Sequence, residues 1–364
     1  MKYNRENFQH LEGVEMIKFK DEIVNGEVLT ICSYMISSPD LWKIPMAKEC
    51  RGITWNADGK CVCLPFEKFF NLGENSETQE QDMLWNDFYT VAEKRDGSMI
   101  TSVVVKGEVF LKTKKSFYSD VAYVASNSLD EHLIEFCLLC DTMRVTPIFE
   151  FTSRSNEIVI DYGLIPSFTL LAMRDMNTGE YAPPAVLEYF GELFHLSIVR
   201  KFGMISLPTL KSQMETKTDF EGYVISFANN IRVKMKTAWY MRLHHAKTDL
   251  RVRDVAEMCM DETIDDVKSV CAGAGLSLEP IEEIERQVAA DLMQIVDETE
   301  SLFGWIRMQE SRKEAAIKFR GNMCFGLAMK LLDGSEPDYK KFWKTNYLKA
   351  YSLRNVYGNF SGEV

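Results

Sequence analysis

The hydrophobic pattern changes type about two-thirds of the way along the chain, and this change limits the folds open to it. Up to about Tyr240, short apolar runs alternate with turn residues, which is typical of strands mixed with helices. Beyond His244 these runs stop, and apolar residues recur every three or four positions. This helical spacing is carried by Ile281, Ile284, Val288, Leu292, Ile295, Val296, Leu302 and Ile306.

Several segments of the first part have strand composition. Residues 100–105 and 108–112 predict one hairpin. Residues 223–227 and 231–235 predict another, because the turn pair Asn229-Asn230 between them tolerates positive φ. Further strand candidates are residues 147–152, 157–160 and 168–173. Helical spacing is found instead in residues 121–140 and 185–196.

Start and stop signals support helices in the last third of the chain. Pro280 suits the first turn of a helix. Ser311 and Glu314 form a capping box that opens another helix, and Gly321 could end it. The sequence therefore predicts an α+β fold. An N-terminal domain with antiparallel sheets, residues 1–243, would be followed by an all-helical C-terminal domain, residues 244–364.

Composition excludes several classes of protein. The chain has 364 residues, 46% of them apolar and 26% charged, which suits two globular domains. No apolar run approaches the roughly 20 residues of a membrane span, and the N-terminus lacks a signal-peptide core. The nine cysteines are scattered and odd in number, so we expect buried thiols in a reducing compartment, the cytoplasm.

Charge is unevenly distributed. The net charge of −12 argues against a protein that coats nucleic acid nonspecifically. Residues 261–300 hold 12 acidic and 2 basic residues, net −10, whereas residues 301–364 hold 11 basic and 6 acidic, net +5. The basic segment is either a solvated helical surface or a docking face for an RNA backbone, which would make affinity salt-dependent. Its cations include Arg312, Lys313, Lys318, Arg320, Lys340, Lys341, Lys344 and Lys349.

A lysine motif, Lys94-Arg95-Asp96-Gly97, is the first of four elements that carry chemistry in a fixed order. Lys94 offers an amine that could attack a phosphate, provided that nearby cations or a metal favour its unprotonated form. Asp96 is short and polar, and Gly97 lets the backbone approach a nucleotide closely. Taken alone, the tetrad is equally compatible with a surface turn.

Two carboxylates follow. Glu150 lies between Phe149 and Phe151 in a strand pattern, so if the phenylalanines face the core, Glu150 faces the opposite side and could hold a ribose hydroxyl. Glu221 precedes Gly222 and a strand, and its carboxylate could meet Mg²⁺ or a phosphate-bound water. An exposed strand carboxylate and a simple turn are the alternatives for these positions.

Lys234 and Lys236 alternate along a predicted strand, so both ammonium groups project from one face. Two like charges repel unless an anion such as the α-phosphate of a nucleotide lies between them. Solvated surface lysines are the alternative. The joint occurrence of all four elements, in order and each on the expected kind of element, favours a covalent nucleotidyl transferase.

This order of motifs resembles that of DNA ligases, RNA ligases and mRNA capping enzymes. The narrower resemblance is to the RNA ligase 1 family, the tRNA-repairing RNA ligases of T-even bacteriophages. It covers about the first 245 residues well and the helical tail more loosely. It rests further on Glu49-Cys50-Arg51-Gly52-Ile53, Glu67-Lys68-Phe69-Phe70-Asn71-Leu72, Asn156-Glu157-Ile158-Val159 and Trp239-Tyr240.

The resemblance implies catalytic roles at seven positions. They are Lys94 as the AMP-accepting nucleophile, Asp96, Gly97, Lys114, Glu221, Gly222 and Tyr240. Lys114 matches a cation that the family uses between the lysine motif and the first glutamate motif. Lys112 and Lys115 are close enough to leave that register open.

The resemblance also implies the nucleotide and metal contacts. Tyr34, Arg51 and Lys68 would contact ATP or its phosphates, Glu150 the ribose, and Lys234 and Lys236 the α-phosphate. Glu221 would serve a metal, Mg²⁺. Asp265 and Asp266 match a metal site in the family's helical domain, although an acidic solvated loop explains them equally well.

The implied activity is ATP-dependent RNA ligation. Lys94 would take AMP from ATP, AMP would pass to an RNA 5′-phosphate, and a 3′-hydroxyl would then displace it. The implied partner is cleaved tRNA, with a separate end-healing kinase and phosphatase, in a monomeric phage enzyme of the host cytoplasm.

Two alternatives remain at the sequence level. One is a DNA ligase or mRNA capping enzyme, but these follow the paired lysines with a β-rich OB-fold, whereas this tail is predicted to be helical. The other is a noncatalytic RNA-binding protein, which would not need an activated lysine.

Overall fold

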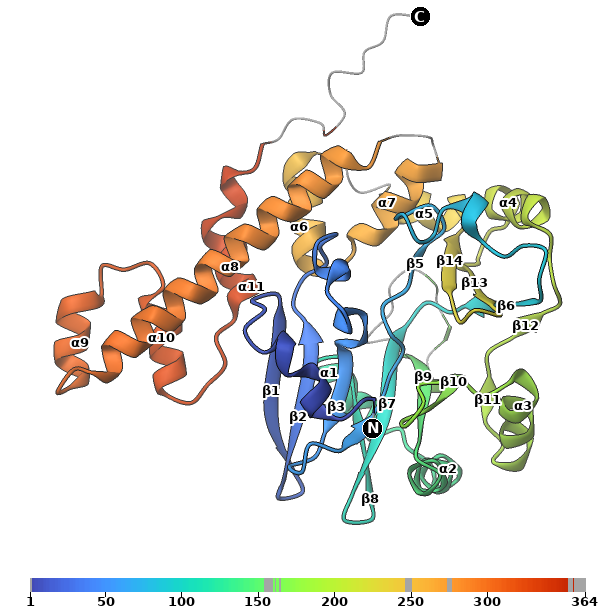
Figure 1. The fold of residues 1–364 in the computed structure, drawn as a ribbon, viewed down its shortest axis with the longest axis horizontal. Helices are drawn as coiled ribbons and strands as arrows, with labels where there is room; N and C mark the ends of the chain where they lie inside the picture. The colour runs from blue at the N-terminus through green and yellow to red at the C-terminus, as the bar shows by residue number, and fades with distance from the viewer. Residues whose placement is uncertain are drawn as a thin grey trace, which may run out of the picture. The chain divides into compact units, whose positions relative to one another are not determined.

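The computed structural model describes residues 2–153, 160, 162–163, 165–245, 251–273, 277–352 and 356. The chain divides into two compact units. The first comprises Met1–Met35, Trp42–Lys247 and Lys268–Leu276, and the second Ile36–Leu41, Thr248–Val267 and Ser277–Val364. The strands of three mostly antiparallel sheets lie in the first unit (Figure 1).

The first sheet is antiparallel and has the order β1-β2-β3-β4. Its strands are β1 (Ile17–Val24), β2 (Glu27–Tyr34), β3 (Arg51–Trp55) and β4 (Cys61–Cys63). The second sheet has the order β11-β10-β9-β7-β8, and only its edge pair β10/β11 is parallel. Its strands are β7 (Ser98–Val105), β8 (Glu108–Lys112), β9 (Val145–Thr152), β10 (Ser167–Asp175) and β11 (Ser197–Ile198).

The third sheet has the order β12-β6-β13-β14-β5, with a parallel pair between β14 and β5. Its strands are β5 (Phe70–Asn71), β6 (Tyr89–Lys94), β12 (Lys201–Phe202), β13 (Gly222–Phe227) and β14 (Arg232–Lys236). Alternate residues face opposite sides of a strand. The odd-numbered apolar residues of β6, β13 and β14 form one core cluster with Leu210 and Met214. The even-numbered residues therefore face away from that core.

The helices that lie wholly in the first unit, among the described residues, are α1 (Asp120–Ser126), α2 (Glu131–Thr142), α3 (Pro184–Leu193), α4 (Leu207–Thr216) and α5 (Ala238–His245). Helices α2 and α3 cover one face of the second sheet (Figure 1), where Phe136 and Phe190 pack against Phe149 and Leu170. Residues of the first and second sheets share another cluster, which includes Ile31 and Val103.

The last third of the described chain is helical. Its elements are α6 (Val252–Asp261), α7 (Ile264–Gly273), α8 (Glu279–Arg307), α9 (Arg312–Phe319), α10 (Phe325–Leu332) and α11 (Tyr339–Asn346). The long helix α8 packs against α6, α10 and α11, as Figure 1 shows within this unit. It buries the apolar stripe predicted from the sequence, and Pro280 lies in its first turn as expected. The predicted α+β fold class, with antiparallel sheets and a helical C-terminal region, is confirmed.

Local predictions are mostly confirmed. The two hairpins are β7/β8 and β13/β14, and Asn230 has the positive φ expected of the second turn. The Ser311 side chain accepts from the amide of Glu314, as a capping box requires. The strand expected at residues 157–160 falls almost wholly outside the described residues.

Residues 121–140, predicted to be helical, are helical over most of their length and form two helices. Helix α1 ends at Ser126, and α2 begins after Asp130. The Asp130 carboxylate accepts from the Leu133 amide at 2.8 Å. An aspartate that satisfies a free amide in this way favours a helix start over continuation.

All nine cysteines are free and buried, in agreement with the sequence prediction of buried thiols. None of the described helices combines the length and the apolarity needed to traverse a lipid bilayer.

The core between α2 and the second sheet generates a stability prediction. Phe136 is fully buried and its ring contacts those of Phe149, Phe190 and Phe194. Phe136→Ala removes these contacts and leaves a cavity, so we expect the free energy of unfolding to fall by about 3–5 kcal/mol in a urea titration. The exposed neighbour Glu135 provides the control. Glu135→Ala should change stability by no more than about 0.5 kcal/mol, and equal losses in the two variants would contradict this packing.

Candidate active site

Three residues on one rung of the third sheet define the centre of the site. Lys94 at the end of β6 pairs with Gly222 of β13, and Gly222 pairs on its other side with Lys236 of β14. Residues directly opposite each other in antiparallel strands project from the same face. The sheet therefore presents two ammonium groups on one face, separated by a residue without a side chain.

Gly222 is required by this arrangement. A Cβ at this position would lie 1.9 Å from the carbonyl oxygen of Met235 and 2.8 Å from the Cα of Lys236. Both neighbours are backbone atoms of the adjacent strand and cannot move without opening the sheet. Any side chain at residue 222 would thus separate the strands that carry the two lysines.

Glu221 joins the two lysines. Its side chain is 1% exposed, and its Oε1 lies 2.6 Å from Lys94 Nζ and 3.0 Å from Lys236 Nζ. Its Oε2 is buried and has no hydrogen-bond partner among the residues that the structure describes. The Glu221 carbonyl accepts from the amide of Thr237, which fixes the backbone just before β13. One carboxylate oxygen is thus occupied by two cations, while the other is available.

Glu150 faces the same site from the second sheet. Phe149 and Phe151 are buried in core clusters, and Glu150 pairs with Met99 and Thr169 on the opposite face of β9, as the sequence pattern predicted. Burial raises the pKa of Glu150 to about 7. The charge of Lys94 opposes this rise, and that of Glu221 adds to it. The pKa of Glu150 therefore depends on the charges of Lys94 and Glu221 as well as on burial.

The turn after Lys94 is held on several sides. Asp96 is buried, and its carboxylate accepts from the hydroxyl of Tyr240 at 3.0 Å and from the amide of Ile160 at 2.9 Å. The amide of Asp96 donates to the Tyr162 hydroxyl at 3.1 Å. A Cβ at Gly97 would lie 2.6 Å from the carbonyl oxygen of Phe151, so the turn packs directly on β9. The aspartate and glycine of the lysine motif therefore fix the turn next to Lys94.

Tyr240 is buried and supports Lys236 as well as Asp96. The Nζ of Lys236 lies 4.7 Å from the centre of the Tyr240 ring, a distance at which the ring attracts a cation. Thr237 starts this segment by donating its hydroxyl to the carbonyl of Phe220. The aromatic residue after the paired lysines is thus in contact with two members of the site.

Lys112 and Lys114 occupy different environments. Lys112 is fully buried and donates to the carbonyl of Gly52 at 2.9 Å, and burial lowers the pKa of Lys112. Lys114 lies with its Nζ 4.0 Å from the centre of the Tyr34 ring. Gly52 has φ +99°, and a Cβ there would meet the Lys114 carbonyl at 2.7 Å. Lys112 is therefore part of the interior, whereas Lys114 lies beside Tyr34, another predicted site residue.

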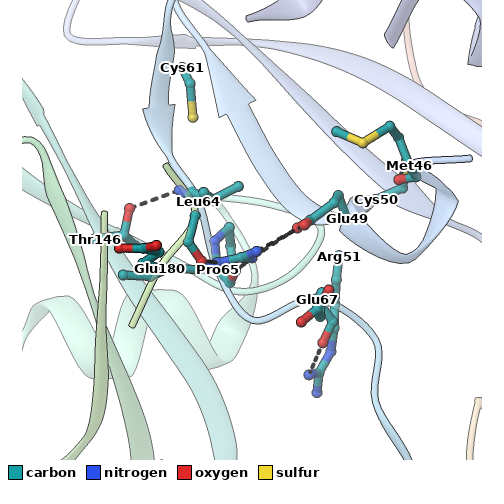
Figure 2. Close-up of polar contacts among 12 residues, drawn as sticks. Met46, Glu49, Cys50, Arg51, Cys61, Leu64, Pro65, Glu67, Thr146 and Glu180 are labelled. Carbon is teal, nitrogen blue, oxygen red and sulfur yellow. Dashed lines mark hydrogen bonds and ion pairs between the residues drawn. The ribbon is translucent and has the colours of Figure 1, made fainter. Parts of the chain in front are cut away.

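Arg51 and Lys68 come from two segments that contact each other. Arg51 donates to the carbonyl of Glu67 at 3.4 Å, a contact drawn in Figure 2. The amide of Lys68 donates to the carbonyl of Lys48 at 2.7 Å. The Lys68 side chain is buried, with Nζ 5.1 Å from the centre of the Phe70 ring. Since Phe70 pairs with β14, Lys68 lies near the strand that carries the paired lysines.

The remaining predicted residues lie at defined places. Lys234 shares a rung with Val224 and Asn71, one step along the same face of β14 from Lys236. Asp265 and Asp266 lie in the first turn of α7. Over the described ranges, no group of three or more His, Cys, Asp or Glu side chains is arranged to hold a metal ion. The metal contacts predicted for these aspartates stay a prediction.

Sequence reasoning missed two residues of the site. Tyr162 lies 66 positions from the amide that it contacts, and the cation Arg95 lies 4.2 Å from the centre of its ring. Trp42 lies edge-on to Tyr34, with ring centroids 5.0 Å apart, and 5.6 Å from Lys68 Nζ. An aromatic residue without a motif around it gives no signal of such contacts in a single sequence.

Comparison with known proteins identifies the family. The RNA ligase family profile matches residues 49–240, more than half of the chain, and the chain belongs to this family. A protein of Thermovibrio ammonificans, named provisionally as an RNA ligase, is 30% identical over 251 residues, covering 66% of this chain and 64% of that protein. RNA ligase 1 of bacteriophage TS2126 is 27% identical over 260 residues, covering 68% of this chain and 65% of its own. The chain thus aligns with a little under two-thirds of each relative.

The fold is similar to that of a solved archaeal ATP-dependent RNA ligase. The superposition has a TM-score of 0.52 at 15% sequence identity and covers 90% of this chain and 96% of that one. At this identity the likeness concerns the fold alone.

The rung geometry predicts a sharp difference between two glycines. Gly222→Ala forces a methyl group against β14, so we expect the free energy of unfolding to fall by about 3 kcal/mol. Gly203 is exposed, and a Cβ there would meet nothing within 4 Å. Gly203→Ala should therefore change stability by no more than about 0.5 kcal/mol. Urea titration of both variants measures the difference, and a tolerated Gly222→Ala would contradict the close approach of β13 and β14.

The raised pKa of Glu150 predicts a pH dependence of stability. The unfolded carboxyl titrates near 4.3, so between about pH 4.3 and 7 the folded chain retains a proton that the unfolded chain has lost. Stability contributed by the neutral carboxyl is complete below this window and falls as the pH rises through about 7. Glu150→Gln cannot ionise, and its advantage in unfolding free energy over the parent should grow to about 3 kcal/mol by pH 8.

Urea titrations at pH 4, 6 and 8 measure this advantage. Glu108→Gln, at an exposed position of the same sheet, serves as the control and should follow the parent at every pH. Parallel pH profiles for Glu150→Gln and the parent would contradict the buried, proton-retaining carboxyl.

Proposed function

We propose that the chain is an ATP-dependent RNA ligase that forms a covalent lysine–AMP intermediate on Lys94. The observation that carries this proposal is the buried carboxylate of Glu221 shared by Lys94 and Lys236. Lys94 and Lys236 lie on one rung of the sheet, and Glu221 contacts both, which supports roles as nucleophilic amine, phosphate-binding cation and proton acceptor. Membership of the RNA ligase family supports the same reaction.

In the first step, Lys94 Nζ forms a bond to the α-phosphorus of ATP, and the bond from that phosphorus to pyrophosphate breaks. The amine must lose a proton before it can attack. Glu221 Oε1 lies 2.6 Å from the nitrogen, within reach for that proton. Lys236, and Lys234 one step further along the strand, would balance the charge on the α-phosphate.

The nucleotide would be held by groups on three sides. Glu150 would accept from a ribose hydroxyl, and Arg51 and Lys68 would contact the phosphates. Tyr34, with Lys114 beside it, would line the nucleotide pocket. Asp96, Gly97, Gly222 and Tyr240 would act by holding Lys94 and Lys236 in place, a role supported by the hydrogen bond between Asp96 and Tyr240.

Glu221 is also the residue best suited to a metal ion. Its buried Oε2 has no hydrogen-bond partner in the described part of the chain, and carboxylate oxygen is the ligand that Mg²⁺ prefers. When bound, Mg²⁺ would neutralise charge on the reacting phosphate. Asp265 and Asp266 would supply a second metal contact.

The later steps would join RNA ends. AMP would pass from Lys94 to an RNA 5′-phosphate, and a 3′-hydroxyl would then attack that phosphate, releasing AMP and forming the phosphodiester. We take the substrate to be cleaved tRNA, made ready by a separate end-healing kinase and phosphatase. The enzyme would be phage-encoded and act as a monomer in the host cytoplasm.

We assign residues 1–243 to adenylation and residues 244–364 to recognition of the tRNA. Three of the cations expected to face RNA lie in ion pairs within the helical unit: Arg312 with Asp333, Lys340 with Glu262, and Lys344 with Glu257 and Asp261. These pairs partly neutralise the basic surface, so a phosphate backbone would have to compete with carboxylates for them.

Covalent labelling tests the proposed function. Incubation with Mg²⁺ and ATP labelled in its α-phosphate, followed by denaturation, should leave the label on the chain. Lys94→Ala should abolish it, because the substitution removes the amine proposed as the nucleophile. Lys211→Ala removes an exposed lysine that pairs with Glu80 on the surface, and it should be labelled like the parent.

Other outcomes point to other proteins. Equal label on Lys94→Ala would contradict the assigned nucleophile. Labelling by GTP rather than ATP would indicate a capping enzyme, and preferential sealing of nicked duplex DNA a DNA ligase. RNA binding that is unchanged in Lys94→Ala, without any labelling of the parent, would indicate a noncatalytic RNA-binding protein.

A further inference from the structure

A buried guanidinium outside the catalytic rung connects two segments of the site. Arg174 on β10 is 2% exposed. Its Nη1 and Nη2 each donate to one oxygen of the Glu49 carboxylate at 2.8 Å. Nη1 also donates to the carbonyl of Pro65 at 2.6 Å, and Nε to the carbonyl of Gly179 at 3.0 Å. The fork of one side chain thus bonds to both Glu49 and Pro65, which are labelled in Figure 2.

The two segments held by Arg174 lead directly to two cations of the proposed nucleotide site. Glu49 lies two residues before Arg51, and Pro65 lies three residues before Lys68. The segments are also bonded to each other, because Arg51 donates to the Glu67 carbonyl and the Lys68 amide donates to the Lys48 carbonyl. The position of both cations therefore depends on how these segments are anchored.

The second sheet provides the anchor. Arg174 pairs with Thr146 of β9, and the Thr146 hydroxyl accepts from the amide of Leu64 at 2.8 Å. Figure 2 shows this contact beside Pro65. One rung of the sheet thus holds residues 64 and 65 through a hydroxyl and a guanidinium. The rings of Tyr3 and Tyr181 lie 5.5 Å and 4.9 Å from the guanidinium and cover it.

The chemistry of this pair indicates a positional rather than a purely stabilising role. A buried ion pair seldom stabilises a fold more than apolar residues of the same size, because both ions lose their hydration. What a bidentate guanidinium–carboxylate pair adds is a fixed relative orientation of the two side chains. An arginine is required for this geometry, since lysine offers a point charge without the planar fork.

We propose that Glu49 and Arg174 are positioning residues that set the placement of Arg51 and Lys68 on the phosphates of ATP. The role of these two cations rests on the proposed function, whereas the connection through Arg174 rests on the hydrogen bonds. In this proposal Glu49 and Arg174, which are buried and paired with each other, do not contact ATP themselves. They act through the cations at the ends of the two segments.

A double-mutant cycle on ATP binding tests this role. Equilibrium dialysis with ATP and Mg²⁺ is carried out on the full chain carrying Lys94→Ala, so that binding is measured without reaction. Arg174→Lys and Glu49→Gln should each weaken ATP binding about 10-fold in this chain. In a chain that also carries Arg51→Ala, Arg174→Lys and Glu49→Gln should each weaken ATP binding by less than about 3-fold. The effects of substitutions at residues that act as one unit do not add.

Two further variants separate position from stability. Leu133→Ala lowers the stability of the same domain from a buried site in another cluster, and it should leave ATP affinity unchanged. Thr146→Val keeps the branched shape of the side chain but removes the hydroxyl that contacts the Leu64 amide and the Cys63 thiol, so it should weaken ATP binding by about 3-fold. Because this variant keeps both charges, its ATP affinity tests the proposal even if Arg174→Lys and Glu49→Gln fold poorly.

Equal losses with and without Arg51 would overturn the proposal, as would ATP affinity that falls in Leu133→Ala in step with stability. Unchanged affinity in Glu49→Gln and Thr146→Val would also overturn it. A parent chain that binds ATP but is never labelled would instead defeat the proposed function, and the cycle would still report on the coupling between Arg174 and Arg51.

Discussion

The site depends on one buried carboxylate that two lysines share. Glu221 is almost fully enclosed and has Lys94 and Lys236 on the same oxygen. Removing one partner from a buried charge group costs about 3–5 kcal/mol, because the remaining charge is left without solvent or counter-ion. The carboxylate therefore holds the unliganded site together and keeps the two ammonium groups close despite their repulsion. Binding of a triphosphate would supply negative charge to Lys94 and Lys236 and so allow them to leave Glu221.

Aromatic rings provide the second means of holding cations. Lys236 lies over Tyr240, and Lys114 lies over Tyr34. A ring face attracts an ammonium group without neutralising its charge. The carboxylate of Glu221 restrains Lys94 and Lys236, and the aromatic rings add a contact to Lys236 and to Lys114. Together they account for a strongly basic site in a chain of net charge −12.

Sequence periodicity predicted those features that depend on short-range geometry, such as the face of a strand on which a residue lies. The alternation around Glu150 correctly predicted that, with its flanking phenylalanines in the core, Glu150 faces the other way, because neighbouring strand residues face opposite sides. It could not predict that Gly222 lies between Lys94 and Lys236, since register between distant strands depends on the whole sheet. The contact of Arg174 with a carboxylate 125 residues away is likewise a product of tertiary packing. Sequence motifs thus indicated residues that the structure brings together, such as Lys94, Glu221 and Lys236, but not the contacts that hold them.

The most direct test of this account is a crystal structure with a non-hydrolysable ATP analogue and Mg²⁺. We predict that Lys94 Nζ leaves Glu221 Oε1 and lies in line with the α-phosphorus, while Glu221 Oε2 turns to the metal or to water bound to it. Lys236 would contact the α-phosphate. A structure in which the analogue binds but Lys94 stays paired with Glu221, with the α-phosphate beyond reach of either lysine, would contradict the central role given to this carboxylate.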